Sequence, residues 1–246
     1  MVRIDAGGLH YKVLNEKIWE AVDSGEKEIV LDNVCGQRYI GAGIKSRDIK
    51  IEINGVPGND LGAFMDGPTI IVNSNCQDGT GNTMNDGKII INGDCGDILG
   101  FSMRGGQIYV KGNAGYRVGI HMKSYKDNFP VLVIGGFVRD FLGEYMAGGI
   151  LIVLGLEKDR DGKVIGNFVK TGMHGGEIFI RGEIEERQIG EKTEDLLATE
   201  EDLLRIEPYV KEYCELFKYD YAEIMNEKFY KLKPLTHRPY GRLYAY

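Results

Sequence analysis

The chain of 246 residues lacks most of the features that identify a membrane protein or a nucleic-acid-binding protein. Its formal net charge is −7 and its pI is near 5.3, which argues against binding to nucleic acid or to an anionic membrane. No apolar run is long enough to span a bilayer, and the start, Met1–Asp5, does not resemble a signal peptide. We therefore expect a soluble, cytoplasmic protein that contacts neither membrane nor nucleic acid.

The motifs of common active sites are also missing. The sequence contains no G-x-S-x-G, H-E-x-x-H or C-x-x-C segment, and its four cysteines are too few for a disulfide scaffold. Glycine is abundant, with 35 residues, but the glycine-rich segments lead into strands. A phosphate-binding loop would lead into a helix N-terminus. We therefore assign no catalytic, cofactor-binding or metal-ligating residue to this chain.

The glycines belong to an internal repeat. A Met recurs every nineteen residues in the middle of the chain, with a Gly three residues earlier and branched aliphatic residues twelve and fourteen earlier. The spacing then lengthens, but the pattern continues. A period near twenty residues indicates units that bury their apolar faces by stacking on one another. The repeat core consists of Met65, Met84, Met103, Met122, Met146, Met173, Gly62, Gly81, Gly100, Gly119 and Gly143.

Each repeat contains one alternating segment, such as Lys88–Asn92, which reads as a strand. Nineteen residues leave no room for a helix beside it, but they suffice for one coil of a parallel β-helix. We predict a mainly-β solenoid of about seven coils, roughly 30 Å long at about 4.8 Å per coil. The Met column is interpreted as core packing, because Met fills irregular gaps.

The two ends of the chain differ from the repeats. Residues 1–34 should form a helix over His10–Asp23, stopped at Gly25, and an entry strand, and residues 35–185 the repeat domain. Residues 186–246 predict a helical extension, with a capping box at Thr199 and Asp202. Pro208 is expected to open a further helix. The aromatic and basic tail, 237–244, could dock on a partner or pack on the solenoid.

One column of side chains lies thirteen residues before each Met, between the two inward aliphatic residues, and should point outward. It starts at Glu52 and is otherwise apolar, whereas a solvated face should carry polar residues. A contiguous apolar stripe usually has something docked on it. The helices after residue 183 are the preferred cover; the first helix, another subunit or a second copy are the alternatives. The docking stripe consists of Ile71, Ile90, Tyr109, Val133, Ile152 and Phe179.

Several polar residues also recur in register. Asn54, Asn73 and Asn92 predict a ladder of side-chain amides along the stack. A second column, Asp60, Asp78 and Asp97, is reminiscent of the carboxylate pairs of polysaccharide-cleaving β-helices. Such enzymes need a groove for sugar, usually with aromatic platforms, and we do not assign that role.

Cysteine and histidine give no clear metal site. Cys76 and Cys95 are nineteen residues apart and should stack within disulfide range, but cytosolic thiols normally stay reduced. An apolar ladder is the favoured interpretation, and a bridge or shared metal the alternative. His121 and His174 flank their Met neighbours on opposite sides, so they do not form a stacked ligand pair.

The segments 100–106 and 143–155 resemble the GXGXG repeat domain of glutamate synthase. The resemblance covers about residues 30–185 and implies a right-handed β-helix without catalytic residues. Glutaminase chemistry and FMN-dependent synthesis of glutamate would then belong to neighbouring parts. The chain is similar to a stand-alone form of this domain. The resemblance implies a structural subunit with a glutamine amidotransferase and an FMN synthase-domain subunit as partners, and with FMN and iron–sulfur groups on those partners. A homo-oligomer stays open.

Two other functions remain open at this point. The C subunit of formylmethanofuran dehydrogenase shares the repeat, so the chain could brace that assembly instead. A self-standing β-helix that cleaves or binds carbohydrate is the third hypothesis. Genes beside this one would separate the first two: an amidotransferase and an FMN synthase for one, a molybdopterin subunit for the other.

Overall fold

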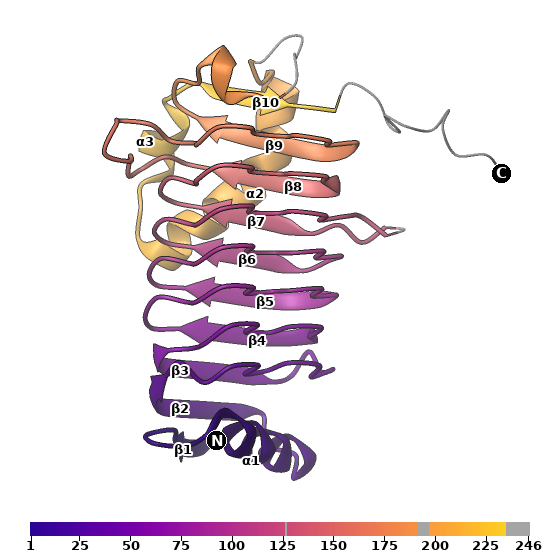
Figure 1. The fold of residues 1–246 in the computed structure, drawn as a ribbon, viewed down its shortest axis with the longest axis vertical. Coiled ribbons are helices and arrows are strands. Elements are labelled where there is room, and N and C mark those ends of the chain that lie inside the picture. The colour runs from indigo at the N-terminus through magenta and orange to yellow at the C-terminus, as the bar shows by residue number, and fades with distance from the viewer. Residues whose placement is uncertain (126, 191–196, 235–246) are drawn as a thin grey trace, which may run out of the picture.

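The computed structural model describes residues 1–125, 127–190 and 197–234. Ten strands form one sheet in sequence order, and every neighbouring pair is parallel except the last. Figure 1 shows the strands stacked as successive rungs of a solenoid. The predicted fold class, a mainly-β right-handed parallel β-helix, is confirmed. The strands are β1 (Val2–Asp5), β2 (Glu28–Cys35), β3 (Lys50–Val56), β4 (Asp66–Val72), β5 (Asp86–Ile91), β6 (Gln107–Val110), β7 (Val131–Ile134), β8 (Ala147–Val153), β9 (Gly175–Arg181) and β10 (Phe229–Leu232).

The pairing register follows the sequence period. Ile51 pairs with Ile70, and Ile70 pairs with Ile89, so each step of nineteen residues moves up one rung. The same register continues through the longer coils, where Ile108 pairs with Leu132. Outside the sheet, a second, shorter stack of single parallel bridges runs from Cys76 through Cys95 to Ala114, Val138 and Ile165.

The N-terminal end is closed by helix α1 (Tyr11–Asp23). The side chain of His10 accepts a hydrogen bond from the backbone N–H of Lys12 at 3.4 Å, which caps the helix N-terminus. Leu14 and Ile18 are buried against the interior of the first coils. The predicted helix over His10–Asp23 is confirmed.

The C-terminal extension differs from the prediction in one element. The sequence pattern indicated helices throughout, yet Phe229–Leu232 forms strand β10, antiparallel to β9. Lys231 and Leu232 are buried, which explains the difference, because an edge strand can be driven by pairing and burial where local helical spacing is weak. The helices are α2 (Glu200–Phe217) and α3 (Tyr221–Met225), with a 3₁₀ turn at Glu186–Gln188.

The prediction for Pro208 was wrong. It lies inside α2 instead of opening a new helix. The proline removes one backbone hydrogen bond, at a cost of about 3 kcal/mol. Its side chain is exposed, and Ile206 and Val210 on either side of it are fully buried, so burial of the inner face holds the helix together. The capping box between Thr199 and Asp202 is present as predicted.

Two parts of the predicted C-terminal extension, residues 191–196 and the tail 237–244, lie outside the described residues. Among the described residues, no helix is long and apolar enough to cross a membrane.

Candidate functional site

The interior of the solenoid is a continuous column of methionine side chains. All six Met residues of the repeat core are at most 2% exposed and pack with the inward aliphatic residues of the strands. In five of the six, the Met backbone N–H donates to the carbonyl oxygen of the glycine three residues before it, as Met103 does to Gly100 at 3.1 Å. The repeat therefore encodes a tight turn and a core residue together.

Two features of the turn, its backbone conformation and its close packing, require glycine at this position. The five core glycines have φ between 65° and 71°, a left-handed conformation that residues with a Cβ disfavour. At Gly119, an added Cβ would also lie 2.8 Å from Cδ1 of Leu151, a residue of β8. Positive φ and close packing thus explain why glycine stands at this position in five of the six coils.

The last coil departs from this rule. Three residues before Met173 stands Lys170, with φ 58° and a fully buried side chain. Its Nζ donates to the carbonyl oxygen of Lys233 at 3.4 Å, just beyond β10. The repeat pattern could not predict this residue. It ties the final coil to the C-terminal segment.

The docking stripe lies on the outer face of the sheet and is covered by α2. Tyr109, Val133, Ile152 and Phe179 are fully buried and Ile90 is nearly so, in a hydrophobic cluster separate from the interior one. Ile71 is half-buried at the edge of that cluster. The helical residues that cover the stripe are Ile206, Val210, Tyr213, Cys214 and Phe217.

Two tyrosines anchor the helix to the sheet. The hydroxyl of Tyr109 on β6 donates to Oε2 of Glu212 at 2.7 Å, and Lys88 on β5 pairs with the same carboxylate. Burial, together with Glu212, raises the pKa of Tyr109 far above its usual value. From the helix side, the hydroxyl of Tyr213 donates to the backbone oxygen of Lys111 at 2.9 Å. Each buried hydroxyl therefore has a partner, as burial requires.

A charged cluster, here called the clasp, joins α2 to the end of the sheet. Lys231 on β10 is 4% exposed; its ammonium lies 2.7 Å from Oε1 of Glu177 on β9 and contacts Asp202 on α2. Arg205 pairs with Glu177 at 2.6 Å. Burial disfavours the charged form of Asp202, but hydrogen bonds from Lys231 and Thr199 overcome this and lower its pKa to about 2.

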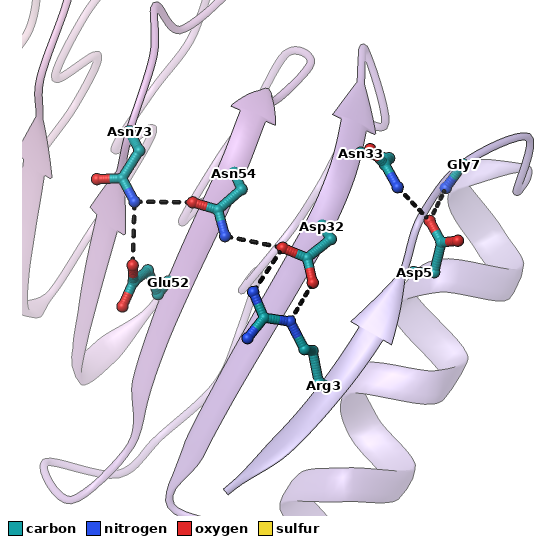
Figure 2. Close-up of polar contacts among 8 residues, drawn as sticks. All are labelled: Arg3, Asp5, Gly7, Asp32, Asn33, Glu52, Asn54 and Asn73. Atoms are coloured by element: carbon teal, nitrogen blue, oxygen red, sulfur yellow. Dashed lines mark hydrogen bonds and ion pairs between the residues drawn. The ribbon is translucent and has the colours of Figure 1, made fainter.

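The predicted amide ladder is confirmed. Asn92 donates to Asn73 at 3.2 Å, and Asn73 donates to Asn54 at 2.9 Å. Figure 2 shows that the ladder continues toward the N-terminus, where Asn54 donates to Asp32 and Asp32 pairs with Arg3 on β1. The ladder connects the N-terminal strand to the repeat coils on their exposed side.

The stacked carboxylates have structural partners. Oδ1 of Asp78 accepts the backbone N–H of Asp97 at 2.8 Å, and Oδ1 of Asp97 accepts the N–H of Tyr116 at 2.9 Å. Asp60 accepts from Asn82 at 2.9 Å. Each carboxylate therefore accepts a hydrogen bond from the next coil. This structural role explains why Asp recurs at this position, and no glycoside-cleaving pair is needed to explain it. A parallel column, not found from the sequence, does the same through Asn75, Asp94 and Asn113.

The cysteines and histidines do not converge. Cys76 and Cys95 pair across adjacent coils but are free thiols, and burial raises the pKa of Cys95 to about 12. His121 stacks on Tyr145 with ring centroids 5.3 Å apart. His174 lies elsewhere, with Nδ1 3.2 Å from the carbonyl oxygen of Gly172. In the part of the chain that the structure describes, no three His, Cys, Asp or Glu residues are grouped to hold a metal ion.

Comparison with known proteins identifies the repeat. The family model described as the GXGXG motif matches residues 27–236. The chain belongs to the GXGXG family. The match includes the coils and also α2 and β10, so the helix on the docking stripe lies within the family region. The chain is also 56% identical over 251 aligned positions to "Uncharacterized protein MJ1350" of Methanocaldococcus jannaschii, covering 99% of this chain and 96% of that protein.

Proposed function

We propose that this GXGXG protein is a non-catalytic structural subunit of a glutamate synthase-type complex. In this proposal it braces separate glutamine amidotransferase and FMN synthase-domain subunits, which convert glutamine and 2-oxoglutarate to glutamate. FMN and iron–sulfur groups belong to those partners. The observation that carries the proposal is the match of the GXGXG family model to most of the chain.

The side chains described above support a bracing role. The interior is filled by Met and aliphatic columns, and the stacked Asp and Asn side chains are used to bind one coil to the next. In a stacked solenoid each coil is stabilised by its neighbours, so a partner bound at one rung is held at a fixed distance from a partner bound at another. This arrangement supports positioning of other subunits, and it offers no group of side chains that we can place in a reaction.

Reconstitution tests the proposal. The full chain should be co-expressed with the amidotransferase and FMN synthase-domain chains encoded in the same genome, and the products analysed by native mass spectrometry. We expect a ternary complex that forms glutamate from glutamine and 2-oxoglutarate, and loss of complex formation when this chain is omitted. Failure of the three chains to associate would overturn the proposal.

Two control experiments test whether the result is specific to the glutamate synthase-type complex. The purified chain alone should be colourless and should have no glutaminase or synthase activity; flavin that co-purifies with it in stoichiometric amount would contradict the proposal. Parallel co-expression with the molybdopterin-binding subunit of a formylmethanofuran dehydrogenase should give no complex. Association there, and not with the synthase chains, would assign the scaffold to that assembly.

A further inference from the structure

The coil between Met122 and Met146 is longer than the coils before it. Met122 and Met146 are 24 residues apart, where the preceding Met residues are nineteen apart. In repeat proteins such insertions tend to lie on one face, which is often the binding face. Here Tyr125 and Asn128 exchange backbone hydrogen bonds of 2.8 and 3.1 Å, so the insertion has a defined turn at its base.

This turn lines a cavity of about 440 Å³ at the edge of the coils. Four of its six lining residues directly follow a core Met, one in each of four successive coils. The backbone N–H of Arg104 donates to Met84 at 2.8 Å, and that of Lys123 donates to Met103 at 3.0 Å. The lining residues are Asp66, Asn85, Arg104, Lys123, Tyr125 and Asn128.

Two cationic residues from successive coils line the cavity. Arg104 and Lys123 lie outside the strands, and their backbones are one coil apart, a step of about 4.8 Å. Neither Arg104 nor Lys123 makes an ion pair with any residue that the structure describes. The nearby cations differ in this respect, because Arg47 pairs with Asp86 and Lys88 with Glu212. Two cations that are unpaired among the described residues thus line one cavity although the chain as a whole is acidic.

The remaining lining groups favour an anion. The side-chain amides of Asn85 and Asn128 and the hydroxyl of Tyr125 are hydrogen-bond donors that carry no charge. The single carboxylate, on Asp66, belongs to the coil beyond Asn85 and so lies two coils from Arg104. An arginine fork beside a lysine ammonium is a common arrangement for binding phosphate oxygens.

We propose that this cavity binds a phosphate dianion, with Arg104 and Lys123 as its charged contacts and Asn85 and Asn128 as neutral donors. Two positive charges match the charge of a dianion. The proposal is independent of the partner subunits, because all of its residues belong to this chain.

The test uses the isotope-labelled full chain and inorganic phosphate as the probe. Titration followed by NMR should give saturable shifts of the side-chain signals of Arg104, Asn85 and Asn128. Arg104→Gln and Lys123→Gln should each weaken binding at least tenfold. Arg104→Lys, which keeps the charge and loses the fork, should weaken it less. A parallel titration with glycerol 3-phosphate distinguishes the source: tighter binding of the ester identifies a phosphorylated small molecule, and equal binding identifies free phosphate.

Lys111→Gln is the matched control, since Lys111 is an exposed cation on the same solenoid and does not line the cavity. It should bind phosphate as the wild type does. Shifts that do not saturate, equal losses in the control and the cavity variants, or undiminished binding by Arg104→Gln would each refute the proposed site.

Discussion

Replacement of Met103 by Asp is the sharpest test of the interior column. Met103 is fully buried, with a coil on either side of it, so an aspartate there has no water and no cationic partner in the core. Removal of the Met side chain costs about 2–5 kcal/mol. Burial of the unpaired carboxyl group adds several kcal/mol. The sum approaches the whole free energy of unfolding of an ordinary domain, about 5–15 kcal/mol.

The assay is thermal and urea unfolding of the full chain, followed both by circular dichroism and by tyrosine fluorescence. At about 2–4 °C per kcal/mol for a chain of this size, Met103→Asp should melt at least about 10 °C lower or fail to fold. Met103→Leu conserves volume and should cost less than about 1.5 kcal/mol. Because coils depend on their neighbours, the two probes need not coincide in the Asp variant.

Asn92→Asp provides the exposed comparison. Asn92 is exposed and loses its amide hydrogen bonds to Asn73 and to the backbone oxygen of Val72, both of 3.2 Å, so the change should cost about 1–2 kcal/mol. If Met103→Asp melts within a few degrees of the wild type, or if the two Asp variants are equally unstable, the inward assignment of the Met column is refuted.

Four further predictions concern other parts of the chain. Gly119→Ala should destabilise by about 2–4 kcal/mol in urea unfolding, the combined cost of positive φ and overpacking; a neutral result would show that the turn can relax. Lys231→Met leaves the mostly buried carboxylate of Asp202 without its cation and that of Glu177 with Arg205 alone, and should cost about 3–5 kcal/mol, with Lys228→Met as the exposed control. Because the pKa of Asp202 is lowered to about 2, its contribution to stability should be full above about pH 4 and lost as the pH falls toward 2, which acid titration of the wild type and the Asp202→Asn variant can measure. Deletion of residues 190–246 should expose the docking stripe, giving dye binding and oligomers; a truncated chain that stays monomeric and dye-negative would count against α2 as the cover.

The sequence was sufficient to predict the features that recur with the nineteen-residue period. The strands, the Met column, the turn glycines and the amide ladder all depend on residues that recur at one spacing, and stacking converts that spacing directly into contact. The outward stripe could be found in the same way, because strand residues alternate between faces.

The remainder depends on contacts that have no period. Lys231 meets Glu177 and Asp202 only after the chain has turned back along the stack, and nothing near Lys231 in the sequence indicates those partners. Pro208 was misplaced because local propensity outweighed, in the prediction, the burial that only the folded sheet supplies. By contrast, the column of Asn75, Asp94 and Asn113 has a nineteen-residue spacing and could have been recognised.

The two covered ends of the stack have a consequence for how the protein can change in length. A parallel stack could in principle be extended by a second molecule, but α1 covers the first end, and at the other end Leu197 and Ala198 pair with β10. The number of coils is therefore fixed by the sequence of one chain and does not depend on association between chains. Since α2 covers the stripe only from about β5 onward, duplication of one coil between β3 and β4 would leave the clasp and both ends untouched. It would move the two ends apart by a single step of about 4.8 Å. The length of this solenoid can therefore change in evolution only by whole coils.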